Sequence, residues 1–161
     1  MLGVVGGPEK AAVARRFGAD VVVDRRREDF VAVVPKATGG RGADVVYEPV
    51  GGETDQRSTK CVAFEGGRIL VIGFAGGTIK TPPLSHALVK NYSVVGLRWG
   101  QYATVDPAAV RACHDELTRL VDTGAISLLV TERLALEALA EGVQRLADGA
   151  TIGRVTWVAA P

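Results

Sequence analysis

Short runs of apolar residues recur along this chain and alternate with segments of helical periodicity, and this alternation limits the folds that the chain can adopt. The runs lie at residues 2–5, 21–23, 45–47, 68–72 and 92–97. Apolar runs of this length are typical of strands covered on both faces, and strands that alternate with helices form parallel sheets. The sequence therefore predicts an α/β fold in which helices flank a parallel sheet.

Proline and glycine mark the two ends of two expected helices. Proline is tolerated in the first turn of a helix, and glycine readily adopts the left-handed conformation that ends one. Pro8 and Gly18 bracket the first of these helices, and Asp106–Pro107 and Gly124 bracket the second. Three shorter helices and a last strand are expected at residues 28–36, 53–62, 137–147 and 152–158.

The second bracketed helix carries apolar residues at helical spacing. They are Val110, Cys113, Leu117, Leu120 and Val121. A continuous apolar stripe of this kind normally packs on a core, so we expect this face of the helix to be buried.

Length and charge exclude several classes of protein. The chain has 161 residues, enough for one core, and its 19 basic and 18 acidic residues produce no overall field that would attract nucleic acid or an anionic membrane. Its two cysteines, Cys61 and Cys113, fall on separate expected helices and suggest no disulfide framework. No signal segment or membrane-length apolar run is present. We therefore expect a cytoplasmic protein with reduced thiols and no nucleic-acid or membrane partner.

The sequence contains no motif of a catalytic or metal site. His86 and His114 have no partner at ligand spacing, and two cysteines cannot form a four-cysteine zinc loop. No G-x-S-x-G elbow, no phosphate-binding P-loop and no G-x-G-x-x-G occurs. We therefore predict no catalytic residue, no metal and no pyrophosphate-binding glycine loop within these residues.

Five stretches, taken together and in this order, carry a resemblance to a known family. They are VVGGPEKAAVARRFGADVVVD, GGRGADVVYEPVGG, GGRILVIGFAGG, KNYSVVGLRWG and GATIGRVTWV. They resemble the nucleotide-binding, C-terminal part of zinc-independent NADPH:quinone reductases of the medium-chain dehydrogenase/reductase superfamily. The resemblance implies one partial nucleotide-binding domain over residues 1–161, with a Rossmann-like core at 1–124 and a segment at 125–161 that returns to the catalytic domain in the family.

The same resemblance implies that the sheet is incomplete. In the family the strand order is 3-2-1-4-5-6, and this chain supplies the equivalents of strands 2 to 6, without strand 1 and without the N-terminal catalytic domain. Loss of the central strand leaves a gap of roughly 9–10 Å and orphaned backbone groups, each costing ~1–3 kcal/mol. Three alternatives are open: another segment fills the gap, the two flanks of the gap close together, or the chain is a fragment of a longer protein.

The resemblance also implies a choice of cofactor. Gly6 stands where NAD-preferring relatives carry an acidic residue, and Lys10 and Arg25 lie nearby in the sequence. Two cations without a carboxylate suit a 2′-phosphate, so Lys10 and Arg25 are expected on the 2′-phosphate and adenine side of NADPH. Weak or absent binding is expected for the chain by itself. The alternative for both residues is a solvated helix face and loop.

Three further groups of residues are implied to border the cofactor. Val50 and Gly51 follow a strand end beside the adenosine, and Gly73, Phe74 and Ala75 border the nicotinamide. Trp99 and Gly100 resemble the pair that walls the nicotinamide pocket. The alternative for these residues is that the glycines make tight turns and the aromatic rings pack in the core.

Two functions of different class follow from these observations. The first is a part of an oxidoreductase that transfers hydride from NADPH to a quinone or enone, with the chain alone inactive. The second is a catalytically silent remnant that acts as an assembly module, and a wrongly assigned gene start stays open beside a true truncation. The resemblance implies a homodimer through the edge strand Tyr92–Leu97, or a separate chain that supplies the missing domain.

Overall fold

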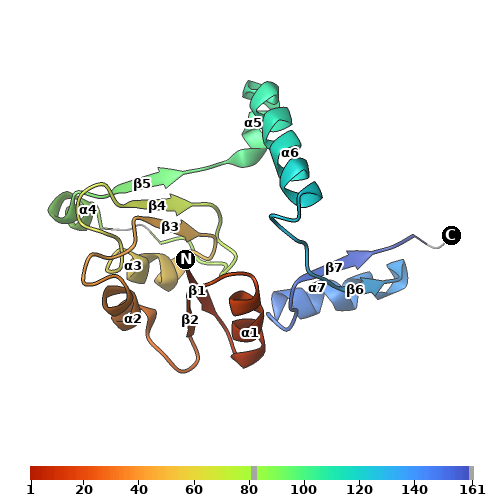
Figure 1. Ribbon diagram of the computed structural model, residues 1–161, viewed down its shortest axis with the longest axis horizontal. Helices are drawn as coiled ribbons and strands as arrows, with labels where there is room; N and C mark the ends of the chain where they lie inside the picture. Colours follow the sequence, from red (N-terminus) through yellow and green to blue (C-terminus); the bar gives the residue numbers. More distant parts are fainter. Residues whose placement is uncertain (81–82, 160–161) are drawn as a thin grey trace. The chain divides into compact units, whose positions relative to one another are not determined.

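A computed structural model of the chain describes residues 1–80 and 83–159. The chain divides into two compact units, Met1–Trp99 and Gly100–Pro161. Figure 1 shows strands and helices alternating along the first unit. The predicted α/β fold class, an incomplete Rossmann-type set of parallel strands with flanking helices, is confirmed.

The first unit contains two separate parallel sheets. Strand β1 (Leu2–Val5) pairs with β2 (Val21–Asp24), and a second sheet has the order β3 (Val45–Glu48), β4 (Arg68–Val71), β5 (Ser93–Gly96). All five strands fall on the predicted apolar runs. Within residues 1–80 and 83–159, no ladder joins β1 to β3, so the flanks of the expected gap have not closed into one sheet.

Four helices lie between these strands: α1 (Pro8–Arg16), α2 (Phe30–Ala37), α3 (Gly52–Ser58) and α4 (Leu84–Lys90). α1 begins at Pro8 as predicted. α2 begins at Phe30 because the Asp29 carboxylate caps it, accepting a hydrogen bond from Val31 N at 2.9 Å. α4 was not predicted: Leu84, Ala87 and Leu88 stand at helical spacing, but the helix has only seven residues, too few for a clear periodic signal.

The predicted helix at residues 53–62 is wrong over its last turn, and Cys61 lies in a turn after α3. Ala43 N donates to Cys61 O at 2.8 Å, and Ala63 N donates to Ala43 O at 2.9 Å. These bonds form an isolated parallel bridge between Ala43 and Val62, which holds the chain extended where a helix was expected.

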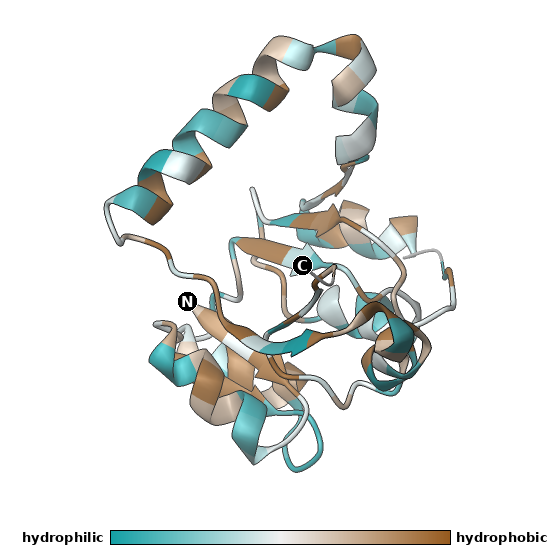
Figure 2. Ribbon diagram, turned by 90° about the vertical axis from the view of Figure 1, so that its right-hand side faces the viewer, coloured by the Kyte–Doolittle hydropathy of each residue, from teal (hydrophilic) through white to brown (hydrophobic). Residues whose placement is uncertain are grey.

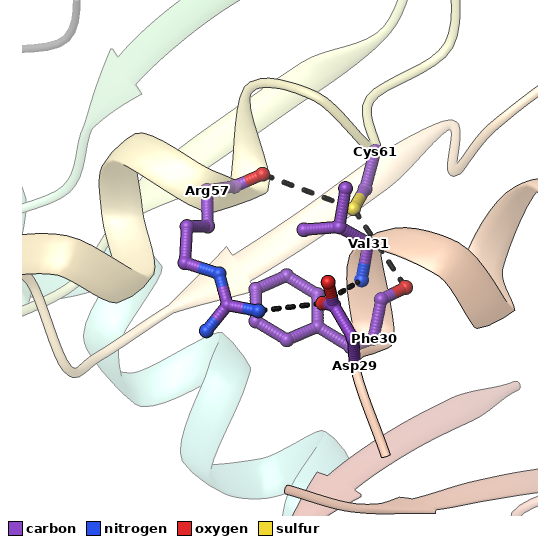
Figure 3. Close-up of polar contacts among 5 residues, drawn as sticks. All are labelled: Asp29, Phe30, Val31, Arg57 and Cys61. Carbon is purple, nitrogen blue, oxygen red and sulfur yellow. Dashed lines mark hydrogen bonds and ion pairs between the residues drawn. The ribbon is translucent and has the colours of Figure 1, made fainter.

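Packing between α2 and α3 links the two sheets. The Arg57 guanidinium bonds to the Asp29 carboxylate at 2.5 Å and lies 4.9 Å from the centre of the Phe30 ring, as Figure 3 shows. The Cys61 thiol points to Phe30 O and Arg57 O, and burial raises its pKa, so it acts as a core side chain. The core around it also contains Val23 of β2.

A second core lies under the three-stranded sheet and contains Val62, Ile69 and Tyr92. Val46 and Val71 pack against it from one face of the sheet. Val45 and Tyr47 point to the other face of β3, because side chains alternate along a strand, and they are 49% and 67% exposed.

The second unit contains helices α5 (Trp99–Val105), α6 (Pro107–Asp122) and α7 (Leu139–Ala147), the 3₁₀ turn η1 (Leu136–Ala138), and strands β6 (Val130–Leu134) and β7 (Arg154–Trp157). α5 begins at the last residue of the first unit. Asp106 caps α6 as predicted, accepting from Ala109 N at 3.0 Å. β6 and β7 pair in parallel, so the two C-terminal segments pair with each other.

The expectation that the apolar row of α6 is buried is wrong. None of the residues of α6 is buried, and Leu117 and Val121 are about half exposed. The long helix in Figure 2 shows hydrophobic and hydrophilic residues mixed along its length. In contrast to α6, α7 packs closely on the β6–β7 pair. A Cβ added at Gly142 of α7 would lie 2.9 Å from Leu134 Cδ1 of β6. No helix in the described part of the chain combines the length and apolar character needed to cross a bilayer.

Candidate functional site

The first candidate cluster lies at the carboxyl ends of β1 and β2, and we call Gly6, Gly7, Arg25 and Arg26 the glycine–arginine cluster. Val5 pairs with Asp24, so the residues that follow the two strands are neighbours. A Cβ added at Gly6 would lie 3.2 Å from Nε and 3.3 Å from Nη2 of Arg25. The structure thus brings together two of the predicted site residues, Gly6 and Arg25, and the guanidinium of Arg25 packs against the backbone of Gly6.

Asp24 fixes the shape of this cluster. Its carboxylate Oδ1 accepts hydrogen bonds from Arg26 N at 3.1 Å and Gly7 N at 2.8 Å. These bonds to the Arg26 and Gly7 amides hold the pKa of Asp24 below its ordinary value. The carboxylate is therefore engaged by the protein backbone, and cationic groups dominate this end of the sheet.

Arg26 was not predicted as a site residue, although the Arg25–Arg27 run was a visible signal. Its Nη1 lies 3.2 Å from the position of a Cβ added at Gly7, so its side chain also folds over the glycine pair. Lys10 lies in the first turn of α1, which begins directly after Gly7. Three cationic side chains are thus placed on the elements that meet at this end of β1 and β2.

The second candidate cluster consists of two adjoining loops, residues 49–52 after β3 and 73–77 after β4, which we call the paired loops. Ala75 N donates to Pro49 O at 3.0 Å, and Gly76 N donates to Val50 O at 2.9 Å. Parallel pairing of β3 and β4 brings both loops to the same edge of the sheet. Two of the predicted groups, after β3 and after β4, therefore do lie together.

Glycine is needed at the closest approach between the paired loops. Gly51 has a φ of 76°, and an added Cβ would lie 2.6 Å from Phe74 Cδ1 and 3.1 Å from Thr78 O. Gly73 is less crowded, with Pro49 O at 3.6 Å from its added Cβ. The ring of Phe74 thus lies directly over the backbone of Gly51.

Glu48, at the end of β3, anchors the first of the paired loops. It is 3% exposed, and its Oε1 accepts from Val50 N at 2.8 Å and Gly51 N at 3.1 Å. Its Oε2 accepts from the Ser58 hydroxyl of α3 at 3.1 Å. Glu48 was not predicted as a site residue, although a carboxylate at the end of an apolar strand run is a visible signal in the sequence.

Trp99 and Gly100 occupy a different place from the other predicted residues. Both lie in the first turn of α5, with Trp99 at the end of the first unit and Gly100 at the start of the second. Trp99 is 45% exposed. The structure assigns neither residue to the glycine–arginine cluster or to the paired loops.

The two clusters present backbone groups, glycines and cations at the carboxyl ends of parallel strands, where open α/β sheets bind ligands. The chemical character of this arrangement suits an anionic ligand, and the side chains of the two clusters include no nucleophile. Within the described residues, no group of three histidine, cysteine or acidic side chains is placed to hold a metal ion.

Comparison with known proteins gives consistent results. The family model of zinc-binding dehydrogenases matches residues 1–115. The chain is 32% identical over 148 residues to a quinone oxidoreductase-like protein 2 homolog of Nematostella vectensis, covering 91% of this chain and 40% of that protein. It is 33% identical over 154 residues to a quinone oxidoreductase of Pseudomonas aeruginosa, covering 95% of this chain and 47% of that protein.

Solved structures agree with these relatives. The quinone oxidoreductase of Escherichia coli, solved in complex with NADPH, matches with a TM-score of 0.88 and 28% identity over 98% of this chain and 48% of that one. The chain thus spans less than half the length of each of these three proteins. The family match and the quinone oxidoreductase relatives confirm the predicted resemblance, and the chain belongs to the zinc-binding dehydrogenase family of the medium-chain dehydrogenase/reductase superfamily, as a quinone oxidoreductase-like member.

Proposed function

We propose that this chain supplies the cofactor-binding part of an NADPH-dependent oxidoreductase that reduces a quinone or an enone. The observation that carries the proposal is the glycine–arginine cluster. Its arginines fold over Gly6 and Gly7, while the nearby carboxylate of Asp24 is held by backbone amides. A site that gathers cations, and whose carboxylate accepts hydrogen bonds from backbone amides, favours a phosphate over a ribose hydroxyl. The NADPH complex of a structural neighbour supports this choice of cofactor.

The residues present fit NADPH in chemical character. Lys10 and Arg25 would hold its 2′-phosphate, and Arg26 adds a third cation on the same side. Val50 and Gly51 would border the adenosine. NADPH, when bound, supplies the hydride, while this chain binds and orients it.

The nicotinamide side of the proposal rests on the second of the paired loops. Gly73, Phe74 and Ala75 would border the nicotinamide ring, and Trp99 and Gly100 would form a wall of its pocket. The buried carboxylate of Glu48 fixes the loop after β3, and hydrogen bonds join that loop to the loop after β4. The backbone groups of both loops are therefore held in place before any ligand binds.

Hydride transfer also requires an acceptor about 3–3.5 Å from the nicotinamide. The sequence contains no G-x-G-x-x-G loop to grip the pyrophosphate. We therefore propose that the 161 residues by themselves bind NADPH weakly and reduce no quinone, and that the acceptor pocket is completed by further polypeptide.

Replacement of Lys10 or Arg25 by alanine tests the cofactor assignment. Each change should weaken NADPH binding by roughly 1–2 kcal/mol, the contribution of one charge-assisted hydrogen bond, and leave NADH binding nearly unchanged. Isothermal titration with both cofactors measures this difference. Lys36→Ala, at the exposed end of α2, is the matched control and should change neither affinity. Equal losses for the two cofactors would contradict the assignment.

A second candidate function, an assembly module, is favoured by one observation on β5. All four residues of this strand are exposed, and Val94 and Val95 are among them. β5 is an edge strand of its sheet, and an exposed apolar edge pairs readily with another strand. We propose a two-fold dimer in which the Tyr92–Leu97 segments of two copies run antiparallel.

Light scattering tests the dimer at micromolar concentration. The expected mass is twice the 16.9 kDa of the chain. Val94→Lys adds a charge to the exposed edge and should shift the mass toward that of one chain, whereas Leu128→Lys adds a charge at an exposed loop position and should not. A monomeric mass for the unaltered chain would refute the dimer.

A further inference from the structure

Three polar side-chain atoms in the first unit are buried and have no hydrogen-bond partner in the described part of the chain. They are Oδ1 of Asp55 in α3, Nδ1 of His86 in α4 and the hydroxyl of Tyr92, directly before β5. The side chains of Asp55 and Tyr92 are 2% and 6% exposed. The large majority of buried side-chain polar atoms in proteins have a partner, either in the protein or in ordered water, so each of these three atoms calls for one.

The three residues come from elements that cover the same face of the three-stranded sheet. β3, β4 and β5 are parallel and adjacent in chain order. Right-handed crossovers that step in one direction across a sheet place their helices on one face, so α3 and α4 lie on the same face. Tyr92 faces this side too, because it belongs to the core cluster with Ile69, against which Ala87 of α4 packs.

Direct contacts bring these elements together around the three atoms. The ring centres of His86 and Tyr92 lie 5.8 Å apart. Lys90 Nζ, at the end of α4, donates to Val62 O at 2.9 Å in the segment after α3. Burial and, second to it, the negative charge of Asp55 raise the pKa of Tyr92, so the carboxyl and the hydroxyl are close enough to interact. The three polar atoms are thus gathered where α3, α4 and the start of β5 meet.

We propose that Asp55, His86 and Tyr92 form a binding site for one internal water molecule, which hydrogen-bonds to the Asp55 carboxyl, to Nδ1 of His86 and to the Tyr92 hydroxyl. A buried water typically makes about three hydrogen bonds to polar groups that are otherwise unpaired. The bound water would join α3, α4 and the start of β5 by polar contacts, in addition to the core packing. This proposal does not depend on nucleotide binding, because none of the three residues belongs to the glycine–arginine cluster or to the paired loops.

The donors and acceptors of the three side chains suit water. A tyrosine hydroxyl donates or accepts, a carboxyl accepts when ionised and also donates when protonated, and one nitrogen of a neutral imidazole accepts. Water both donates and accepts, so it can satisfy all three groups in either form of the carboxyl. A metal ion is disfavoured, because one carboxyl, one imidazole and a neutral hydroxyl provide fewer ligands and less charge than structural metal sites use.

A crystal structure of the whole chain at high resolution tests the site directly. One density peak should lie about 2.5–3.2 Å from a carboxyl oxygen of Asp55, from Nδ1 of His86 and from the hydroxyl oxygen of Tyr92, which is the range of hydrogen bonds. A peak only about 2.0–2.2 Å from these atoms would indicate a metal ion and would overturn the proposal. The lack of any peak within hydrogen-bond distance of all three atoms would overturn it as well.

Tyr92→Phe provides a test in solution, in which the direction of the change decides. If the water is bound, this change removes one of its partners and leaves the groups around it less well satisfied, so the equilibrium constant of unfolding should rise about fivefold or more. If nothing bridges the three groups, the Tyr92 hydroxyl is a buried polar group without a partner, and its removal should leave the constant unchanged or lower it. Denaturant unfolding measures the constant, and the second result would contradict the proposal.

Tyr47→Phe is the matched control, because it removes a tyrosine hydroxyl from a side chain that is 67% exposed on the other face of the sheet. Its equilibrium constant of unfolding should stay within about twofold of that of the unaltered chain, as is usual for surface changes. A rise as large as that of Tyr92→Phe would mean that loss of any tyrosine hydroxyl destabilises the chain, and the proposal would fail.

A double variant tests whether Asp55 and Tyr92 act through a shared partner. Replacing both polar groups by apolar ones leaves no group unpaired, whereas replacing one leaves the other unsatisfied. The effect of Asp55→Leu with Tyr92→Phe on the unfolding constant should therefore be at least about twofold smaller than the product of the two single effects. Single effects that simply multiply would overturn the proposal. If the leucine variants do not fold, the crystal structure and the direction of the Tyr92→Phe change still decide.

Discussion

The side chain of Asp55 is 2% exposed, and its Oδ1 has no hydrogen-bond partner in the described part of the chain. Burial, with a smaller contribution from the negative charge of Glu48, raises the pKa of Asp55. The Tyr92 hydroxyl is also buried without a described partner, and burial together with Asp55 raises its pKa. Folding therefore favours the neutral form of Asp55, whereas the backbone amides of Arg26 and Gly7 lower the pKa of Asp24.

This residue predicts a pH dependence of stability. Because the folded-state pKa is raised, Asp55 ionises first in the unfolded chain, and stability is lost as the pH rises above about 3.9 and through the folded-state value. The asparagine side chain of Asp55→Asn cannot ionise. The free energy of unfolding of this variant should therefore increase relative to that of the unaltered chain as the pH rises from 4 to 8. Denaturant unfolding across that range measures the difference. Asp115→Asn, on exposed α6, is the control, and its free energy of unfolding should differ from that of the unaltered chain by the same amount at every pH in this range. A difference that is likewise independent of pH for Asp55→Asn would contradict the raised pKa of Asp55.

At the scale of elements, the paired loops depend on a glycine at one position more than at another. Gly51 and Gly77 have nearly the same positive φ, 76° and 77°, but an added Cβ meets Phe74 Cδ1 at 2.6 Å only at Gly51 and meets nothing within 4 Å at Gly77. Gly77→Ala should therefore cost about 1 kcal/mol for backbone strain alone. Gly51→Ala should cost at least 1–3 kcal/mol more, the range for overpacking, because the ring and the loop must move.

Thermal and denaturant unfolding give the free energy of unfolding of each variant. The difference between Gly51→Ala and Gly77→Ala is the contribution of loop packing, because the cost of backbone strain is nearly the same in both. Equal destabilisation would mean that the loops do not press against each other as the structure shows. A larger loss at Gly51 would show that the loop after β3 and the loop after β4 behave as one packed unit.

Much of the element order could be predicted because each strand is a short apolar run and several helix ends carry proline, aspartate or glycine. Asp106–Pro107 and Gly124 mark α6 by local chemistry alone. The apolar row of α6 was misread, because periodicity shows an amphipathic face but not whether another element covers it. Arg26 was missed because its place over Gly7 depends on how the Asp24 carboxylate turns the backbone, which one sequence does not reveal.

At the scale of the whole molecule, the first unit is a pair of parallel sheets joined by side-chain packing, with glycine loops and cations at the carboxyl ends of its strands. Residues 1–99 contain both candidate clusters, and of the predicted site residues only Gly100 lies in the second unit. The proposed cofactor role therefore belongs mainly to the first unit. The second unit adds the β6–β7 pair and α7, which contain none of the predicted site residues.

Titration of the isotope-labelled chain with NADPH, followed by NMR, tests the central claim most directly. At millimolar NADPH, the amide signals of Gly6, Gly7, Arg25, Gly51 and Ala75 should shift together and report an affinity no tighter than high micromolar. Signals from α7 should stay in place, and NADH should produce smaller shifts near Arg25. Shifts confined to the second unit, or no shift at either cluster, would contradict the account of these loops as an NADPH site.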